Sequence, residues 1–225
     1  MTDAHCHLLG NDESVRELLI GRDFFGIHPW ETLEGSEGLV ERLSSLSIEL
    51  SSRPQAGVGE IGLDRLKARE IPLAMREAFE RQLKVALELG RPVVLHGAKC
   101  WGQVVETVRR TLEATGLPRP PALLFHGFSR SDGLIPDIVA LGGYISVGSA
   151  VLNDHAVNYR ELVKKIPLER LLVETDRTLE NAAMCPSVRE VLTKTAEIRG
   201  LSAAELEALT DRNAAAFFPP IRNGA

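Results

Sequence analysis

An α/β fold built on a parallel sheet is predicted for this chain of 225 residues, because short apolar, β-rich runs alternate with helical stretches along its length. Two of these runs, 93–95 and 171–173, are continuously apolar, which is typical of parallel strands that are covered on both faces. Seven strands are expected, at 2–8, 23–28, 56–63, 92–96, 122–128, 143–149 and 171–176.

The stretches between the strands carry signals for the beginning and the end of helices. Within 73–89, Glu80 and Lys84 are four residues apart in the order that stabilises a helix, and Gly90 follows as a stop. Three further helices are expected at 131–141, at 186–200 and after the capping box of Ser202 and Glu205.

The sheet is predicted to close as a barrel rather than to stay open. An open, doubly wound sheet usually carries a glycine-rich phosphate loop after its first strand, whereas the first run here ends in His5-Cys6-His7. We therefore expect a single domain, a TIM-type (β/α) barrel over residues 1–218, followed by a C-terminal tail at 219–225.

The composition excludes several classes of protein. With 26 basic and 31 acidic residues the net charge is −5, which argues against a broad basic face for nucleic acid but allows a small cleavage site organised by metal cations. No apolar run approaches the roughly 18 residues of a membrane span, and the N-terminus does not resemble a signal peptide. Three cysteines without a CxxC pair indicate a reducing compartment, so a cytoplasmic protein with no membrane partner is expected.

Residues that can bind a metal ion gather at the predicted carboxyl ends of strands, where barrels carry their chemistry. Two of them, His5 and His7, share one face of a strand because they are two residues apart. The six candidates are His5, His7, Glu60, His96, His126 and Asp176. Imidazole and carboxylate ligands together suit zinc, manganese, nickel or magnesium, and a carboxylate can bridge two ions.

Each candidate also has an ordinary explanation when it is taken alone. An HxH pair is often two surface or core histidines, a histidine after an apolar strand is often hydrogen-bonded in the core, and Glu60 between glycines could be a turn carboxylate. Four of the six histidines nevertheless fall at predicted strand ends, and His28 makes a fifth. This clustering favours a metal site.

The ordered motifs of the chain resemble those of the TatD family of metal-dependent hydrolases, often called TatD-type deoxyribonucleases. The resemblance covers nearly the whole chain. It rests on HCHL at 5–8, GIHP at 26–29, GEIGLD at 59–64, PVVLH at 92–96, HGFSR at 126–130 and IPLERLLVETD at 166–176. A late Asn213 followed by Phe217 is similar to the C-terminal helix of the family.

The resemblance implies a centre with two divalent metal ions. One ion would be held by His5, His7 and Asp176 and the second by His96 and His126, with Glu60 as the bridge between them. Two cations stabilise the attacking and the leaving oxygens of a phosphodiester displacement, and water between them loses a proton near neutral pH. Asp176 would accept that proton. His28 would contact the phosphate or protonate the leaving group, unless it is a neutral core histidine.

Basic residues follow several of the motifs and are expected to face phosphate oxygens at the mouth of the barrel, although each alone is also consistent with a solvated surface charge. They are Arg65, Lys99, Arg130 and Arg177. Asp64 is expected either to orient a histidine ligand or to pair with Arg65.

The sequence departs from the family at several points that spare the expected ligands. Only 18 residues separate His7 from Gly26, where the family has room for a helix and a strand. We therefore expect the second strand to be missing, which leaves a barrel of seven strands or one that is incompletely closed. Trp30 replaces the second histidine of the family's GIHPH, and Ala98 and Gly127 replace an arginine and a cysteine.

The predicted function is that of a divalent-metal-dependent phosphodiesterase or deoxyribonuclease. Single-stranded DNA ends are favoured as substrates, because a pocket at the mouth of a barrel admits an end and the acidic chain lacks a surface for duplex. One alternative is an amide or ester hydrolase. Another is a degenerate barrel kept as a binding protein, against which the complete ligand set argues. The sequence leaves open the metal, the polarity of cleavage and the oligomeric state.

Overall fold

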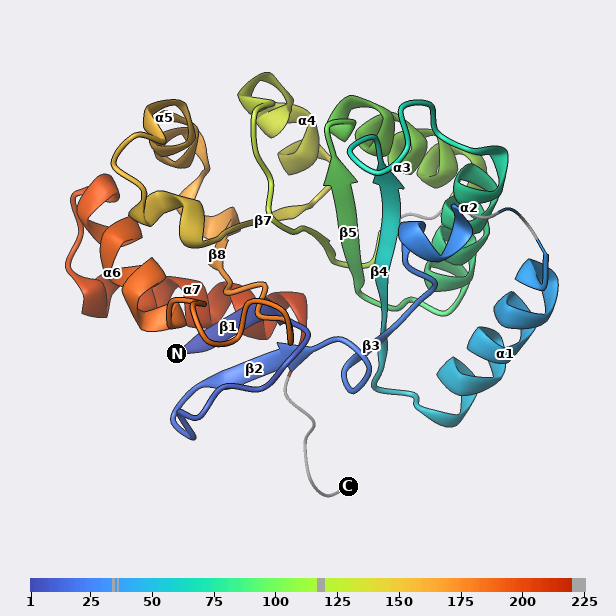
Figure 1. Ribbon diagram of the computed structural model, residues 1–225, viewed down its shortest axis with the longest axis horizontal. Helices are drawn as coiled ribbons and strands as arrows, with labels where there is room; N and C mark the ends of the chain where they lie inside the picture. The colour runs from blue at the N-terminus through green and yellow to red at the C-terminus, as the bar shows by residue number, and fades with distance from the viewer. Residues whose placement is uncertain (34, 36, 117–119, 220–225) are drawn as a thin grey trace.

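The computed structural model describes residues 1–33, 35, 37–116 and 120–219, in which strands and helices alternate (Figure 1). The strands are β1 (Thr2–Cys6), β2 (Arg16–Leu19), β3 (Phe24–Phe25), β4 (Gly57–Asp64), β5 (Val93–Ala98), β6 (Leu123–Phe125), β7 (Tyr144–Val147) and β8 (Leu171–Val173). The α-helices are α1 (Leu39–Ser52), α2 (Leu73–Glu88), α3 (Trp101–Thr115), α4 (Ile135–Ala140), α5 (Val157–Lys165), α6 (Val188–Arg199) and α7 (Ala203–Phe217). Short 3₁₀ helices are η1 (Pro29–Thr32), η2 (Asp132–Leu134), η3 (Ser149–Leu152) and η4 (Leu168–Arg170).

The strands form a parallel barrel that is incompletely closed. Strands β3 to β8 pair in sequence order as a six-stranded sheet, and β1 pairs with β2 as a separate two-stranded sheet. Sparse contacts join the two sheets. A single bridge links Ile20 to Phe24, and the backbone N–H of Asp176 donates to the carbonyl of His5 over 3.1 Å. The α/β barrel class predicted from the sequence is confirmed, with incomplete closure.

The prediction that the second strand is missing is wrong. Arg16–Leu19 forms β2 and pairs in parallel with β1, with Thr2 opposite Arg16, so the described residues contain eight strands instead of seven. The segment 7–23, all of it described, instead lacks the helices that would connect such strands. The strand escapes detection because it is short and only Leu18 within it is fully buried.

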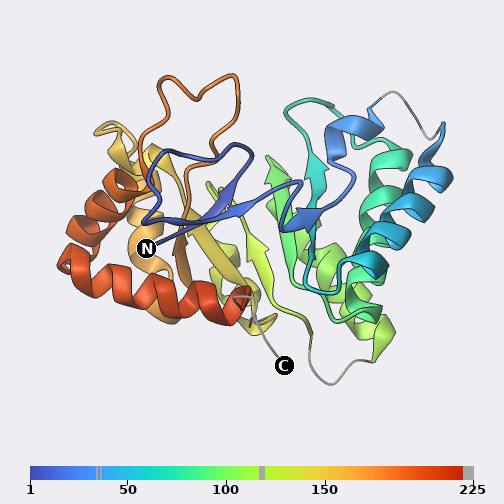
Figure 2. The ribbon, with the colours of Figure 1, turned by 90° about the horizontal axis from the view of Figure 1, so that it is seen from below.

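Helices cover the barrel on two sides. Helices α1, α2 and α3 lie along one side and α6 and α7 along the other, with the strands between them (Figures 1 and 2). Helices α6 and α7 begin at the capping boxes of Ser187 and Ser202, as the sequence predicts for the second. Most of the expected C-terminal tail, 220–225, lies outside the described residues.

The long strand β4 is buried along its whole length and lies tightly against β5. Gly62 makes this approach feasible. Its φ is 150°, and a Cβ atom at this position would lie 2.0 Å from the carbonyl oxygen of His96. A residue with a side chain would separate the two strands, and with them the carboxyl ends that carry Glu60 and His96.

A buried glutamine fixes the segment that leads to His28. The Ile27 N–H donates to Oε1 of Gln82 over 2.6 Å, and Nε2 of Gln82 donates to the Ile27 carbonyl over 3.1 Å. We expect Gln82→Met to lower the free energy of unfolding by about 2 kcal/mol, because both buried backbone groups of Ile27 lose their partner. Urea unfolding measures this loss. The exposed neighbour Arg81→Met is the control, and equal stabilities of the two variants would contradict the role of Gln82.

Candidate metal centre

Five side chains from four strands or their ends converge on Glu60 of β4, which is 3% exposed. Its Oε1 lies 2.5 Å from Nε2 of His126 and 2.6 Å from Nδ1 of His96. Its Oε2 lies 3.2 Å from Nε2 of His7 and 3.5 Å from Nε2 of His5. The two carboxylate oxygens therefore face two different pairs of histidines.

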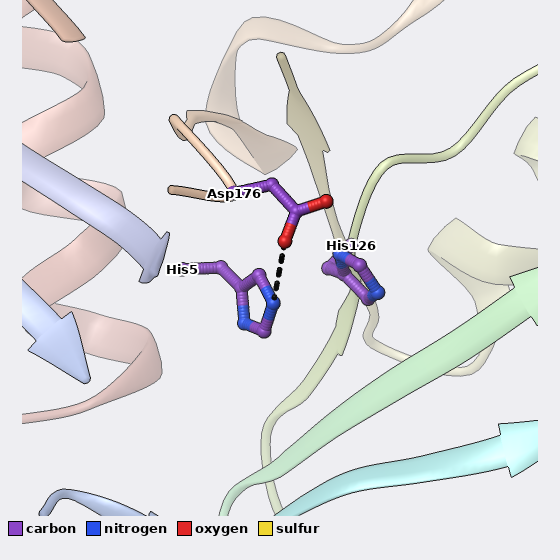
Figure 3. Close-up of side chains that lie close together, drawn as sticks. All are labelled: His5, His126 and Asp176. Carbon is purple, nitrogen blue, oxygen red and sulfur yellow. Dashed lines mark ion pairs between the residues drawn. The ribbon is translucent and has the colours of Figure 1, made fainter. Parts of the chain in front are cut away.

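Asp176 completes the cluster from the turn after β8. Its Oδ1 lies 3.5 Å from Nε2 of His5 and 3.6 Å from Nε2 of His7. Figure 3 shows the Asp176 carboxylate directed toward His5, with the ring of His126 beside it. Asp176 has a left-handed backbone with φ 50°, and Asn181 Nδ2 donates to its carbonyl over 3.1 Å. The structure thus brings together all six residues that the sequence predicts as ligands.

The donor set fits divalent cations. The ring of His5 is fully buried, yet neither of its nitrogens has a hydrogen-bond partner among the described residues. A buried polar atom without a partner is costly unless something absent from the protein chain satisfies it. Within 4.8 Å of one another lie ligand atoms of His5, His7 and Glu60, of His5, His126 and Asp176, and of His28, Glu60 and His96. Such mixed imidazole and carboxylate groups are typical ligands of zinc, manganese and nickel.

The charged groups of the cluster strongly shift one another's pKa values. Burial alone would raise the pKa of Glu60, but His126, His28 and His7 hold it well below its ordinary value. Burial alone would lower the pKa of His126, but Glu60 and Glu174 raise it well above its ordinary value. The pKa of Asp176 is also lowered, because His5 and His126 outweigh its burial. The carboxylates are therefore held in the ionised form that a metal requires.

Further carboxylates orient the histidines from behind. Asp64 Oδ2 accepts from Nε2 of His96 over 3.1 Å, so of its two predicted roles Asp64 has the one of orienting a histidine. In the described part of the chain it has no ion pair with Arg65. Oε1 of Glu174 lies 3.6 Å from Nδ1 of His126, and its other oxygen, Oε2, accepts from the hydroxyl of Ser146. Such partners fix the ring orientation of metal-binding histidines.

Asp3 has a structural role that the sequence analysis missed. Its carboxylate accepts from the N–H of His5 over 3.3 Å and from the N–H and hydroxyl of Thr175 over 3.0 and 2.6 Å. Burial raises the pKa of Asp3 to about 7. Asp3 therefore ties β1, which carries His5, to the turn that carries Asp176. The available signal was an aspartate inside a run predicted to be a buried strand.

His28 lies at the edge of the cluster, with Nε2 3.6 Å from Oε1 of Glu60. Its Nδ1 accepts from the backbone N–H of Trp30 over 3.2 Å. In the neutral ring this places the proton on Nε2, the nitrogen that faces the cluster. The His28 side chain is partly exposed, so it is not a histidine buried in the core.

Of the four basic residues predicted to bind substrate, two line separate cavities and two are exposed just after strands of the sheet. Arg130 lines a cavity of about 900 Å³ together with Asp176, whereas Arg177 lines a separate cavity of about 720 Å³ beside Asp3. Arg65 and Lys99 are exposed after the adjacent strands β4 and β5. Within the described ranges, none of these four cations has a carboxylate oxygen within 4.0 Å, in contrast to Arg160 and Lys165 nearby.

Comparison with known proteins shows to which family this chain belongs. The family model of TatD related DNase matches residues 22–219. The chain belongs to the TatD family. It is 30% identical over 206 residues to the 3′-5′ ssDNA/RNA exonuclease TatD of Escherichia coli (strain K12), which covers 86% of this chain and 76% of that protein. It is 26% identical to the uncharacterised metal-dependent hydrolase YabD of Bacillus subtilis (strain 168), which covers 86% of this chain and 75% of YabD.

Solved structures of TatD proteins confirm the fold. The TatD homologue YjjV from Escherichia coli K12 superposes with a TM-score of 0.71 at 26% identity, which covers 94% of this chain and 79% of YjjV. A TatD family hydrolase from Entamoeba histolytica superposes with a TM-score of 0.63 at 18% identity, covering 92% and 76%. The resemblance to the TatD family seen in the sequence is thereby confirmed.

The TatD family match begins at residue 22, after His5 and His7. It therefore includes Glu60, His96, His126 and Asp176 but not His5 in β1 or His7 directly after it. In the structure both of these histidines lie against Glu60.

Among the helices of the described residues, none is long and apolar enough to cross a membrane.

Proposed function

We propose that this TatD-family chain is an exonuclease that uses two divalent cations to shorten single-stranded DNA or RNA from the 3′ end. The observation that carries the proposal is that the two oxygens of the Glu60 carboxylate face different pairs of histidines. Oε2 lies toward His5 and His7, and Oε1 lies toward His96 and His126. A carboxylate that bridges two cations needs this arrangement. The polarity and the substrate follow from the name of the TatD relatives, 3′-5′ ssDNA/RNA exonuclease.

The six residues would hold the cations as two groups. His5, His7 and Asp176 would hold the first and His96 and His126 the second, with Glu60 shared. When bound, the cations neutralise the charge that develops on the phosphate oxygens and lower the pKa of water. Magnesium, manganese, zinc and nickel all remain compatible with these ligands.

The protein groups around the cations would bind substrate and move protons. Asp176 has 51% of its side-chain surface exposed, lines the cavity of about 900 Å³ and is held ionised, so it can accept the proton of the attacking water. His28 would donate a hydrogen bond from its Nε2–H to a phosphate oxygen, and it would protonate the leaving oxygen only from its imidazolium form, which returns to the neutral ring. Lys99, Arg130 and Arg65 would contact phosphates near the cleaved bond.

The shape and the charge of the molecule support a single-stranded end as substrate. A cavity of about 900 Å³ has the size of a site for a small ligand or a chain end. The net charge of −5 does not provide the broad basic surface that duplex binding requires. We also propose a cytoplasmic location, which the free cysteines Cys6, Cys100 and Cys185 support.

A panel of substrates tests the proposed function. The panel consists of 5′-labelled single-stranded DNA, the matching RNA, the duplex, a 3′-phosphorylated strand and a set of simple amides and esters, each with and without chelator. We expect progressive shortening of the single strands from the 3′ end, and its loss when chelator is present. Hydrolysis of amides or esters alone would replace the nuclease by the other hydrolase class. Binding without any hydrolysis would indicate a degenerate barrel.

Metal binding is expected to stabilise the protein more at high pH than at low pH. In the metal-free protein, the raised pKa of His126 contributes stability that is full below the unfolded value of 6.5 and is lost as pH rises through the folded pKa. The lowered pKa of Glu60 contributes stability above 4.5 and loses it as pH falls. Metal cations compete with protons for the same imidazole nitrogens. At alkaline pH fewer imidazoles are protonated, so metal binding is favoured.

Thermal unfolding with and without manganese measures this linkage. We expect the rise in the unfolding midpoint on adding manganese to be at least about 3 °C larger at pH 8 than at pH 5.5. The Glu60→Gln variant serves as control and should show little response at either pH. A metal response that is the same at both pH values would exclude the histidines as ligands.

A further inference from the structure

Trp30 lies beside the proposed metal centre and contacts two residues at its edge, His28 and Asp64. Its ring is 4.9 Å from the ring of His28 at an angle of 89°. Its Nε1 donates to Oδ2 of Asp64 over 2.6 Å, and the same oxygen accepts from Nε2 of His96 over 3.1 Å. The indole edge is thereby fixed at the rim of the site.

Packing against the protein does not account for this side chain. Trp30 is 47% exposed, whereas the other tryptophan of the chain, Trp101, is 4% exposed and packs in the core. The ammonium of Lys67 lies 4.3 Å from the centre of the Trp30 ring, and Lys67 itself is exposed. A half-exposed ring that is hydrogen-bonded at its edge and has an exposed cation over its face combines the two features that bind single-stranded nucleic acid, which are a stacking surface for a base and a charge for its phosphate.

We propose that Trp30 determines specificity by stacking on the base of the nucleotide next to the cleaved phosphodiester, with Lys67 turning from the ring to the adjacent phosphate. The proposal rests on the proposed nuclease function. It predicts that the enzyme prefers ends that carry a base over ends that do not. Because a π-face is common to all bases, the preference extends to each of the four bases.

Kinetics with two matched substrates test the role of the ring. One is a single-stranded DNA with an intact terminal nucleotide, and the other carries an abasic site there. We expect Trp30→Leu to raise KM for the intact end by about ten-fold and to leave KM for the abasic end unchanged. Trp30→Phe keeps a ring but loses the bond to Asp64, and it should retain most of the preference for the intact end. Ile48→Ala, which removes an exposed apolar side chain on α1, is the surface control.

The phenylalanine variant separates stacking from an indirect effect. If Trp30→Phe lowered kcat as strongly as Trp30→Leu did, and equally for both substrates, Trp30 would act by positioning Asp64 and His96, and stacking would be wrong. Equal KM values of the wild-type protein for intact and abasic ends would also overturn the proposal.

A binding measurement keeps this inference distinct from the proposed nuclease function. With chelator present, tryptophan fluorescence is recorded while intact or abasic strands are added to the wild-type protein. The Trp30→Leu protein, which retains only Trp101, gives the background. Quenching by the intact strand alone supports stacking even if no strand is degraded in the activity assay, in which case only the nuclease proposal fails. Absence of quenching by the intact strand at saturating concentrations overturns the inference, even where the strand is degraded.

Discussion

Glu60→Gln is expected to lower nuclease activity by at least about a thousand-fold. The substitution keeps the shape of the side chain but removes the negative charge that lies 2.5 to 3.6 Å from five histidines. A neutral amide neither bridges two cations nor compensates the charge of the surrounding imidazoles. Degradation of 5′-labelled single-stranded DNA gives the activity, and elemental analysis of the same preparation gives the metal content.

The matched control for this substitution is Glu70→Gln. Glu70 is an exposed residue that has no ion pair with any residue the structure describes. It should retain full activity and full metal content. If Glu60→Gln kept both as well, Glu60 would not be the bridge, and the assignment of the whole cluster would fail.

Asp176→Asn is expected to lower kcat by about a hundred- to a thousand-fold with little change in the fold. Asparagine has the same size and tolerates the left-handed backbone, with φ 50°, that Asp176 adopts. The loss therefore reports the missing proton acceptor and ligand rather than a distorted turn. Circular dichroism and the thermal midpoint should stay close to those of the wild type.

A surface aspartate provides the comparison for Asp176. Asp154 has 84% of its side chain exposed and pairs with Arg160, so Asp154→Asn should leave kcat unchanged. An Asp176→Asn protein with kcat within about three-fold of the wild type would show that this residue does not accept the proton.

The helices that the sequence predicted are those with recognisable ends. Helices α6 and α7 begin at serines whose hydroxyls accept from the backbone three residues later, a pattern visible in the letters. Helices α1, α3 and α5 begin at Gly38, Cys100 and Ala156, none of which caps with its side chain. Helix α2, which the sequence predicted, also lacks a capping side chain at Pro72, and Gly116 ends α3 with a left-handed backbone, so a missing cap does not by itself explain why these three helices were not predicted.

The convergence of the candidate site residues was more predictable than the barrel that carries them. A histidine or a carboxylate at the end of a buried strand is visible in the sequence, and parallel strands bring such ends together. Contacts between distant segments are not visible. Thr175 donates two hydrogen bonds to Asp3, 172 residues away, and Arg177, two residues further on, lines a cavity together with both of them.

The central proposal is that this TatD-family barrel holds a pair of divalent cations around Glu60, and metal stoichiometry tests it most directly. The purified protein is incubated with manganese, magnesium or zinc, desalted and analysed for bound metal per chain. We predict about two equivalents for at least one of these metals, and less than one for Glu60→Gln. A wild-type protein that binds none of them would contradict the account.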